Sequence, residues 1–121
     1  MDAYTYLVAG KRFSASNLTE LKQQLSAYGL VANLDERGFG SFSTRRMSDP
    51  EKTDRYRMLP HHNGFNEDAM YDVVVGLQIG NTLIVGSRSE IEIDMQAIRK
   101  AMNKVKKDIP DAKVMIVSYL D

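Results

Sequence analysis

The chain has 121 residues, 43% of them apolar and 26% charged, a composition typical of one folded domain with one core. Its 16 basic and 16 acidic residues give a net charge of zero, which argues against a general polyanion binder and against a DNA mimic. The absence of cysteine excludes a disulfide scaffold, a zinc finger and a thiol enzyme.

The first residues contain no basic region followed by an apolar run, so we expect no signal peptide, no membrane association and a cytoplasmic location. Residues 3–13 alternate weakly between apolar and polar side chains, which predicts a strand. Ala9-Gly10-Lys11 predicts a turn, after which the chain returns in a second short strand.

A helix is predicted over residues 18–28. Asn17 suits the N-cap, and Glu20 follows three residues later, as in a capping box. Gly29 stands where a left-handed C-cap is needed. The apolar side chains of the helix recur at helical spacing and are Leu18, Leu21, Leu25 and Tyr28. Residues 30–34 then predict a strand, because they are mostly apolar.

The most apolar stretch covers residues 70–93 and predicts a β-hairpin at the centre of the sheet. Its valines and isoleucines favour strand, and Gly80-Asn81 interrupts them with residues typical of turns. A two-residue and a three-residue loop are both compatible with the sequence. We prefer the three-residue loop, because it aligns more apolar groups across one face. Residues 89–93 continue in strand-like alternation.

A second helix is predicted after Asp94, which suits an N-cap. Its apolar stripe is the clearest helical signal in the chain and consists of Ile98, Ala101, Met102, Val105 and Ile109. Pro110 ends the helix, and the apolar residues 112–120 predict a final strand beside the hairpin.

Together these elements predict an α+β fold with a single mixed or mostly antiparallel sheet of five to six strands and two helices packed on one face. Each half of the chain shows the order strand, strand, helix, strand. Residues 44–66 lack periodicity and contain two prolines and a glycine. We therefore expect one domain over residues 1–121 with a long irregular loop at about 44–66, a length typical of functional or disordered loops.

This loop concentrates basic and amphipathic side chains. The candidates for binding a partner are Arg45, Arg46, Arg55, Tyr56, Arg57 and Met58. Arginine suits phosphates and carboxylates, and Tyr56 and Met58 would act as anchors. Acidic residues dilute the positive charge, so a simply solvated loop is the alternative interpretation.

A second candidate surface precedes the loop. Arg37-Gly38-Phe39-Gly40-Ser41-Phe42 resembles the start of the third-strand signature of the RNA-recognition motif, in which aromatic rings stack on bases and the basic residue meets phosphate. The resemblance implies that Arg37, Phe39 and Phe42 contact nucleic acid. Ser41 replaces an aromatic position of the signature, and a glycine-containing turn with an edge strand is the alternative.

The predicted second helix has a basic exposed side, formed by Arg99, Lys100, Lys104, Lys106 and Lys107. Lys100 and Lys104 are further candidates for nucleic-acid contact, whereas lysines that solubilise a helix are the alternative. His61-His62 lacks the spacing of metal ligands, and no nucleophile or orienting carboxylate is identifiable nearby.

The sequence therefore predicts a small non-catalytic interaction protein of the inhibitor or adaptor type, a profile shared by many such proteins of bacteria and their phages. We expect a protein partner, bound through the 44–66 loop and the basic surface. The alternative is a module that binds RNA or single-stranded nucleic acid, and an enzyme that uses His61 or His62 ranks last. No metal or cofactor is expected, and strands with two apolar faces leave a homo-oligomer open.

Overall fold

The computed structural model describes residues 3–33, 43–48, 56–65, 71–84 and 94–120. Within these residues the elements, in chain order, are β1 (Ala3–Ala15), α1 (Leu18–Ser26), β2 (Leu30–Asn33), β3 (Ser43–Arg46), β4 (Tyr56–Phe65), β5 (Tyr71–Ile84), α2 (Met95–Val105) and β6 (Lys113–Leu120). The strands form one sheet in the order β2-β3-β4-β5-β1-β6, with antiparallel neighbours throughout this order. The predicted α+β class is confirmed.

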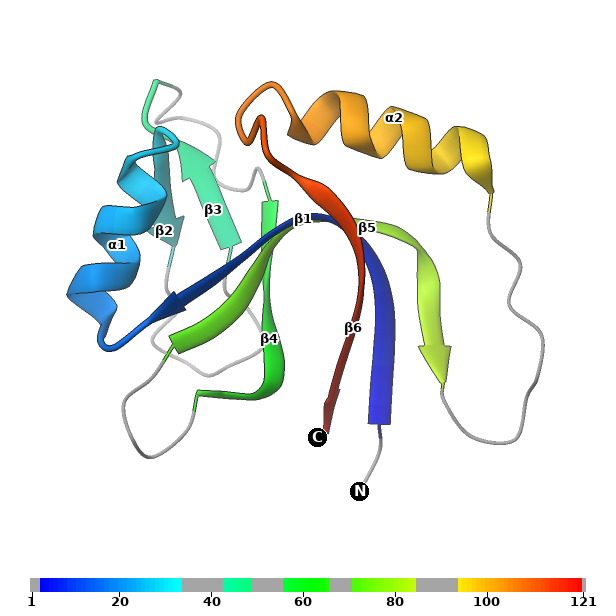
Figure 1. Cartoon of the computed structure of the whole chain (residues 1–121), viewed down its shortest axis with the longest axis horizontal. Coiled ribbons are helices and arrows are strands. Elements are labelled where there is room, and N and C mark those ends of the chain that lie inside the picture. The colour runs from blue at the N-terminus through cyan, green and yellow to red at the C-terminus, as the bar shows by residue number, and fades with distance from the viewer. Residues whose placement is uncertain (1–2, 34–42, 49–55, 66–70, 85–93, 121) are drawn as a thin grey trace.

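The centre of the sheet is a long ribbon of β1 and β5 that bends into an arch (Figure 1). Gly10 and Gly76 face each other midway along this ribbon. A Cβ atom on Gly10 would lie 2.1 Å from the carbonyl oxygen of Val75, and one on Gly76 would lie 2.1 Å from that of Ala9. Because neither residue has a side chain, the two backbones approach more closely here than any other residue type would permit.

The glycine pair marks the place where the outer neighbours of the ribbon change. β4 pairs with β5 from Gly76 toward the start of β5, and β6 pairs with β1 from Gly10 toward the start of β1. β4 and β6 then meet in one parallel pairing, between His62 and Tyr119. β4, β5, β1 and β6 thus close on themselves around a small buried cluster of Tyr6, Val8, Leu59, Val74 and Val117.

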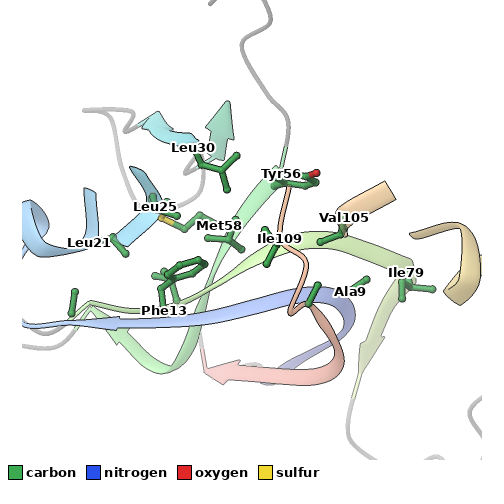
Figure 2. Close-up of a cluster of buried hydrophobic side chains, with 14 residues drawn as sticks. Ala9, Phe13, Leu21, Leu25, Leu30, Tyr56, Met58, Ile79, Val105 and Ile109 are labelled. Carbon is green, nitrogen blue, oxygen red and sulfur yellow. The ribbon is translucent and has the colours of Figure 1, made fainter. Parts of the chain in front are cut away.

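The larger core lies on the opposite face of β1 and β5, where both helices pack, as predicted (Figure 2). Leu21 and Leu25 project from α1, while Val105 ends α2 and Ile109 lies in the turn that follows; all four are fully buried. Burial of each such side chain contributes about 1.5–3 kcal/mol. This core therefore ties both helices to the same side of the arch.

The local signals for the helices are confirmed. The Asn17 Oδ1 atom accepts a hydrogen bond from the Glu20 amide at 2.8 Å, and Glu20 in turn accepts one from the Ser16 amide at 2.8 Å. Asp94 caps α2 in the same way. Gly29 has a φ of 71°, the left-handed conformation that the sequence predicts after α1.

Two predicted turns are wrong. β1 runs through Ala9-Gly10-Lys11 without a break, and β5 runs through Gly80, so the central hairpin does not form. The register between β1 and β5 shifts between Thr5 and Leu7, and Gly80 has a φ of 76°. Gly80 therefore forms part of a β-bulge within the strand. A bulge can need a residue with a positive φ, as a turn does.

The region at 44–66 is also different from the prediction. β3 and β4 occupy much of it, so it is no long irregular loop, and residues 49–55 lie outside the described residues. The final strand, β6, pairs with β1 instead of with β5. The strand predicted at 89–93 lies outside the described residues, so the order strand, strand, helix, strand stays a prediction.

Candidate partner-binding surface

The exposed side of α2 and of the turn after it is basic. All five predicted cations are exposed: Arg99, Lys100, Lys104, Lys106 and Lys107. At 100° per residue, Arg99, Lys100 and Lys104 fall within an arc of about 140° on the helix. None of the five takes part in the salt bridges found among the described residues. The positive charge of this side is therefore open to a partner.

Exposed apolar side chains lie beside this helix on β6. Val114 and Ile116 are 39% and 66% exposed. They pair with Ala9 and Leu7, whose side chains belong to the core under the helices, so they lie on the face of the sheet that α2 covers. α2 contacts β6 as well as β1 and β5, yet it leaves these two side chains uncovered.

We call the five cations of α2 and of the turn after it, together with Val114 and Ile116, the α2–β6 surface. Met95, at the start of α2, is 60% exposed and is a further exposed apolar side chain, on the helix itself. Protein interfaces are enriched in methionine and arginine, and a flexible methionine adapts to partners of different shape. This surface therefore combines exposed positive charge with exposed apolar side chains.

Tyr56 and Met58, the predicted anchors, are buried, with exposures of 2% and 3%. The Tyr56 hydroxyl donates a hydrogen bond to Asp108, in the turn after α2. Arg46 donates to the same carboxylate through Nε at 2.7 Å and through Nη2 at 2.9 Å. These bonds tie β3 and β4 to α2, so the prediction of Tyr56 and Met58 as surface anchors is wrong.

The same contacts explain the electrostatics of Arg46. Its hydrogen bonds to Asp108 raise the pKa of the guanidinium above its ordinary value. Arg46 is therefore committed to a structural ion pair and has little to offer a partner.

Of the remaining loop candidates, Arg57 is exposed and lies on the other face of the sheet. Its Nη1 donates to the Gln78 side-chain oxygen at 2.7 Å, and its guanidinium carbon lies 5.9 Å from the centroid of the Tyr6 ring. Arg45 is half-buried on β3, and Arg55 lies outside the described residues. The structure thus disperses the five loop candidates that it describes instead of gathering them into one site.

The nucleic-acid candidates are divided in a similar way. Arg37, Phe39 and Phe42 lie outside the described residues, whereas Lys100 and Lys104 are exposed on α2. In the described part of the chain, the exposed large apolar side chains are Met47, Met95, Val114 and Ile116. None of these four is aromatic, and aromatic side chains are the ones on which bases stack.

Sequence reasoning missed Val114 and Ile116, although a signal was present. Both faces of residues 112–120 are apolar, which led to the prediction of a central, covered strand. β6 instead lies at the end of the strand order, and α2 covers only part of the face that carries Val114 and Ile116.

Comparisons with known protein families, with curated proteins and with solved structures find no match. Among the described residues, no group of three His, Asp or Glu side chains is arranged to hold a metal ion. Neither helix in the described ranges has the length and apolar character that a membrane crossing requires.

Proposed function

We propose that the protein is a non-catalytic binding protein and that its α2–β6 surface docks on a protein partner with acidic and apolar groups. The observation that supports this most directly is the exposure of Val114 and Ile116 on the sheet face that α2 covers, together with five exposed cations of α2 and its following turn that form none of the salt bridges found among the described residues. The apolar side chains would supply affinity, and the cations would steer an acidic partner and fix its orientation.

A nucleic-acid partner would use the same cations. It would not need Val114 or Ile116, however, because a phosphate backbone gains nothing from aliphatic side chains. The contribution of β6 to binding therefore separates the two functions, and the apolar character of β6 is the reason that we favour a protein.

The test is a capture experiment with tagged protein and three variants. Lys100→Glu/Lys104→Glu reverses charge on α2, and Ile116→Ser removes the apolar group on β6. Lys22→Glu, at an exposed position of α1, makes the same kind of charge reversal on a different helix and is the matched control. The partner is then purified and its affinity for each variant is measured by calorimetry.

We expect the first two variants to bind the partner at least about tenfold more weakly than the parent chain, equivalent to about 1.4 kcal/mol, and Lys22→Glu to bind normally. Rising salt should weaken parent binding. The proposal is refuted if the recovered partner binds all three variants equally. A salt-sensitive shift of RNA or single-stranded DNA that Ile116→Ser leaves unchanged would establish the nucleic-acid alternative instead.

A further inference from the structure

A separate cavity of about 390 Å³ lies where β1 leaves its glycine bend and β6 begins. Its lining residues are Gly10, Lys11, Arg12, Asp111, Lys113 and Met115. Lys113 pairs with Gly10, and Met115 pairs with Val8 of the small enclosed cluster, so the cavity opens on the face of β6 opposite Val114 and Ile116. It is about half open to solvent, and its volume lies near the lower end of the range of small-molecule sites, about 300–1,000 Å³.

Two of the three cations in the lining are held in place by carboxylates. Lys11 Nζ donates to Asp111 Oδ2 at 2.6 Å. Arg12 donates to Asp72 through Nε at 2.7 Å and through Nη2 at 2.6 Å. The Arg12 Nη1 group takes no part in these two bonds. The Arg12 side chain is thus oriented before a ligand arrives, which lowers the entropy cost of binding. Lys11 alternates to the other face of β1, where its Nζ lies 5.8 Å from the centroid of the Tyr28 ring, so its side chain takes no part in the proposed binding.

Lys113 differs from the other two cations. It is exposed, and it takes part in none of the salt bridges found among the described residues. Asp72 balances Arg12 and Asp111 balances Lys11, so Lys113 supplies the uncompensated positive charge of the cavity. A ligand that balances this charge when it enters the cavity carries an anionic group.

We propose that this cavity binds a small molecule through a carboxylate or phosphate group. Lys113 provides the main charge, the free Nη1 of Arg12 adds a hydrogen-bond donor of fixed direction, and the anion lies on the side of the cavity away from Asp111. Met115 offers an apolar wall for a short hydrocarbon part of the ligand. The proposal is independent of the α2–β6 surface.

The test is an NMR titration of the ¹⁵N-labelled full chain with three probes. Inorganic phosphate and propionate each carry one of the two anionic groups, and potassium chloride at matched ionic strength reports the effect of salt alone. The amide signals of Gly10, Lys11, Arg12 and Lys113 are followed. We expect saturable shifts of these signals with phosphate or propionate; the probe that saturates identifies the group.

Two variants make the titration specific. Lys113→Gln removes the uncompensated charge and should weaken binding at least about tenfold, the loss expected from a charge-assisted hydrogen bond. Lys100→Gln removes a comparable exposed charge from α2 and should bind like the parent. Because both positions are exposed, thermal unfolding of the variants should match that of the parent.

Three results would overturn the proposal. The first is that potassium chloride reproduces the shifts. The second is that the shifts saturate with neither phosphate nor propionate. The third is that Lys113→Gln binds the anionic probe as tightly as the parent chain does. Each would mean that the cavity carries only structural ion pairs.

Discussion

Replacement of Gly10 by alanine should be among the most damaging single substitutions in this chain. The new Cβ atom would lie 2.1 Å from the Val75 carbonyl oxygen and 2.9 Å from the Gly76 Cα atom. Backbone atoms cannot rotate away as a side chain does. To restore a contact of 3.0 Å, the strands would have to separate by about 0.9 Å at the centre of the ribbon, the difference between 3.0 and 2.1 Å.

The cost of Gly10→Ala can be built from its parts. Overpacking of a buried site costs about 1–3 kcal/mol. Separation of β1 from β5 adds the loss of neighbouring ladder hydrogen bonds at about 0.5–1.5 kcal/mol each. The lower entropy of the unfolded alanine chain returns only about 0.4–1 kcal/mol. With two ladder bonds lost, these terms give a net loss of about 1–6 kcal/mol in the free energy of unfolding. We expect the upper half of this range, about 3 kcal/mol or more, because the clash is between backbone atoms, and this is a large part of the stability of a small domain.

Gly29→Ala is the matched control. Gly29 has a positive φ of 71°, which Gly10 does not have, but a Cβ atom at Gly29 would meet nothing within 4 Å. Only the cost of a left-handed alanine remains, about 1–2 kcal/mol. Urea unfolding followed by circular dichroism measures both variants. A loss for Gly10→Ala within about 0.5 kcal/mol of that for Gly29→Ala would refute the role that we assign to the close approach.

Three further substitutions test other parts of the structure. Tyr56→Phe keeps the buried ring but removes the hydrogen bond to Asp108, so urea unfolding should show a loss of about 1.5–3 kcal/mol. Leu25→Ala should cost about 2–5 kcal/mol without a change in the slope of the urea transition. The hydrogen bond from Lys11 lowers the pKa of Asp111 below its ordinary 3.8, so its contribution is present above 3.8 and is lost as the pH falls through the lower, folded value. Asp111→Asn should therefore flatten part of the acid side of the stability curve, measured by urea midpoints at several pH values, and an unchanged acid slope would contradict this assignment.

The helices could be predicted because their signals are local. The N-caps Asn17 and Asp94 and the apolar spacing of both helices act within a few residues, and the structure confirms where both helices begin. The predicted end of the second helix at Pro110 is wrong, because α2 ends at Val105 and a turn follows it. The same spacing predicts correctly that Lys100 and Lys104 are exposed. For these parts of the candidate surface, sequence and structure agree.

The strands were harder to predict because the same residue serves several local shapes. Gly10 and Gly80 suit a turn, a bulge or a close approach of two backbones. The choice depends on the pairing of β1 with β5, which joins segments more than 50 residues apart in the chain. Local chemistry therefore located the irregularities correctly but assigned them the wrong form.

The failure to predict that Tyr56 and Met58 are buried has a similar cause. Charged neighbours suggested a solvated loop, yet Tyr56-Arg57-Met58 alternates apolar and charged side chains with the period of a strand. What decides between the two interpretations is Asp108, 52 residues further along the chain, which accepts the hydrogen bond from Tyr56. Because this partner is so distant in the sequence, the residue pattern around Tyr56 does not reveal it.

The alternation of side chains along β6 makes the two proposed sites separable by experiment. Lys113 and Met115 face the cavity, whereas Val114 and Ile116 face the side of α2. Ile116→Ser should therefore leave the titration with phosphate or propionate unchanged, and Lys113→Gln should leave partner binding within about threefold of the parent. If either variant weakened both activities by tenfold or more, the common cause would be a displacement of β6 itself, and neither residue could be assigned to a site of its own.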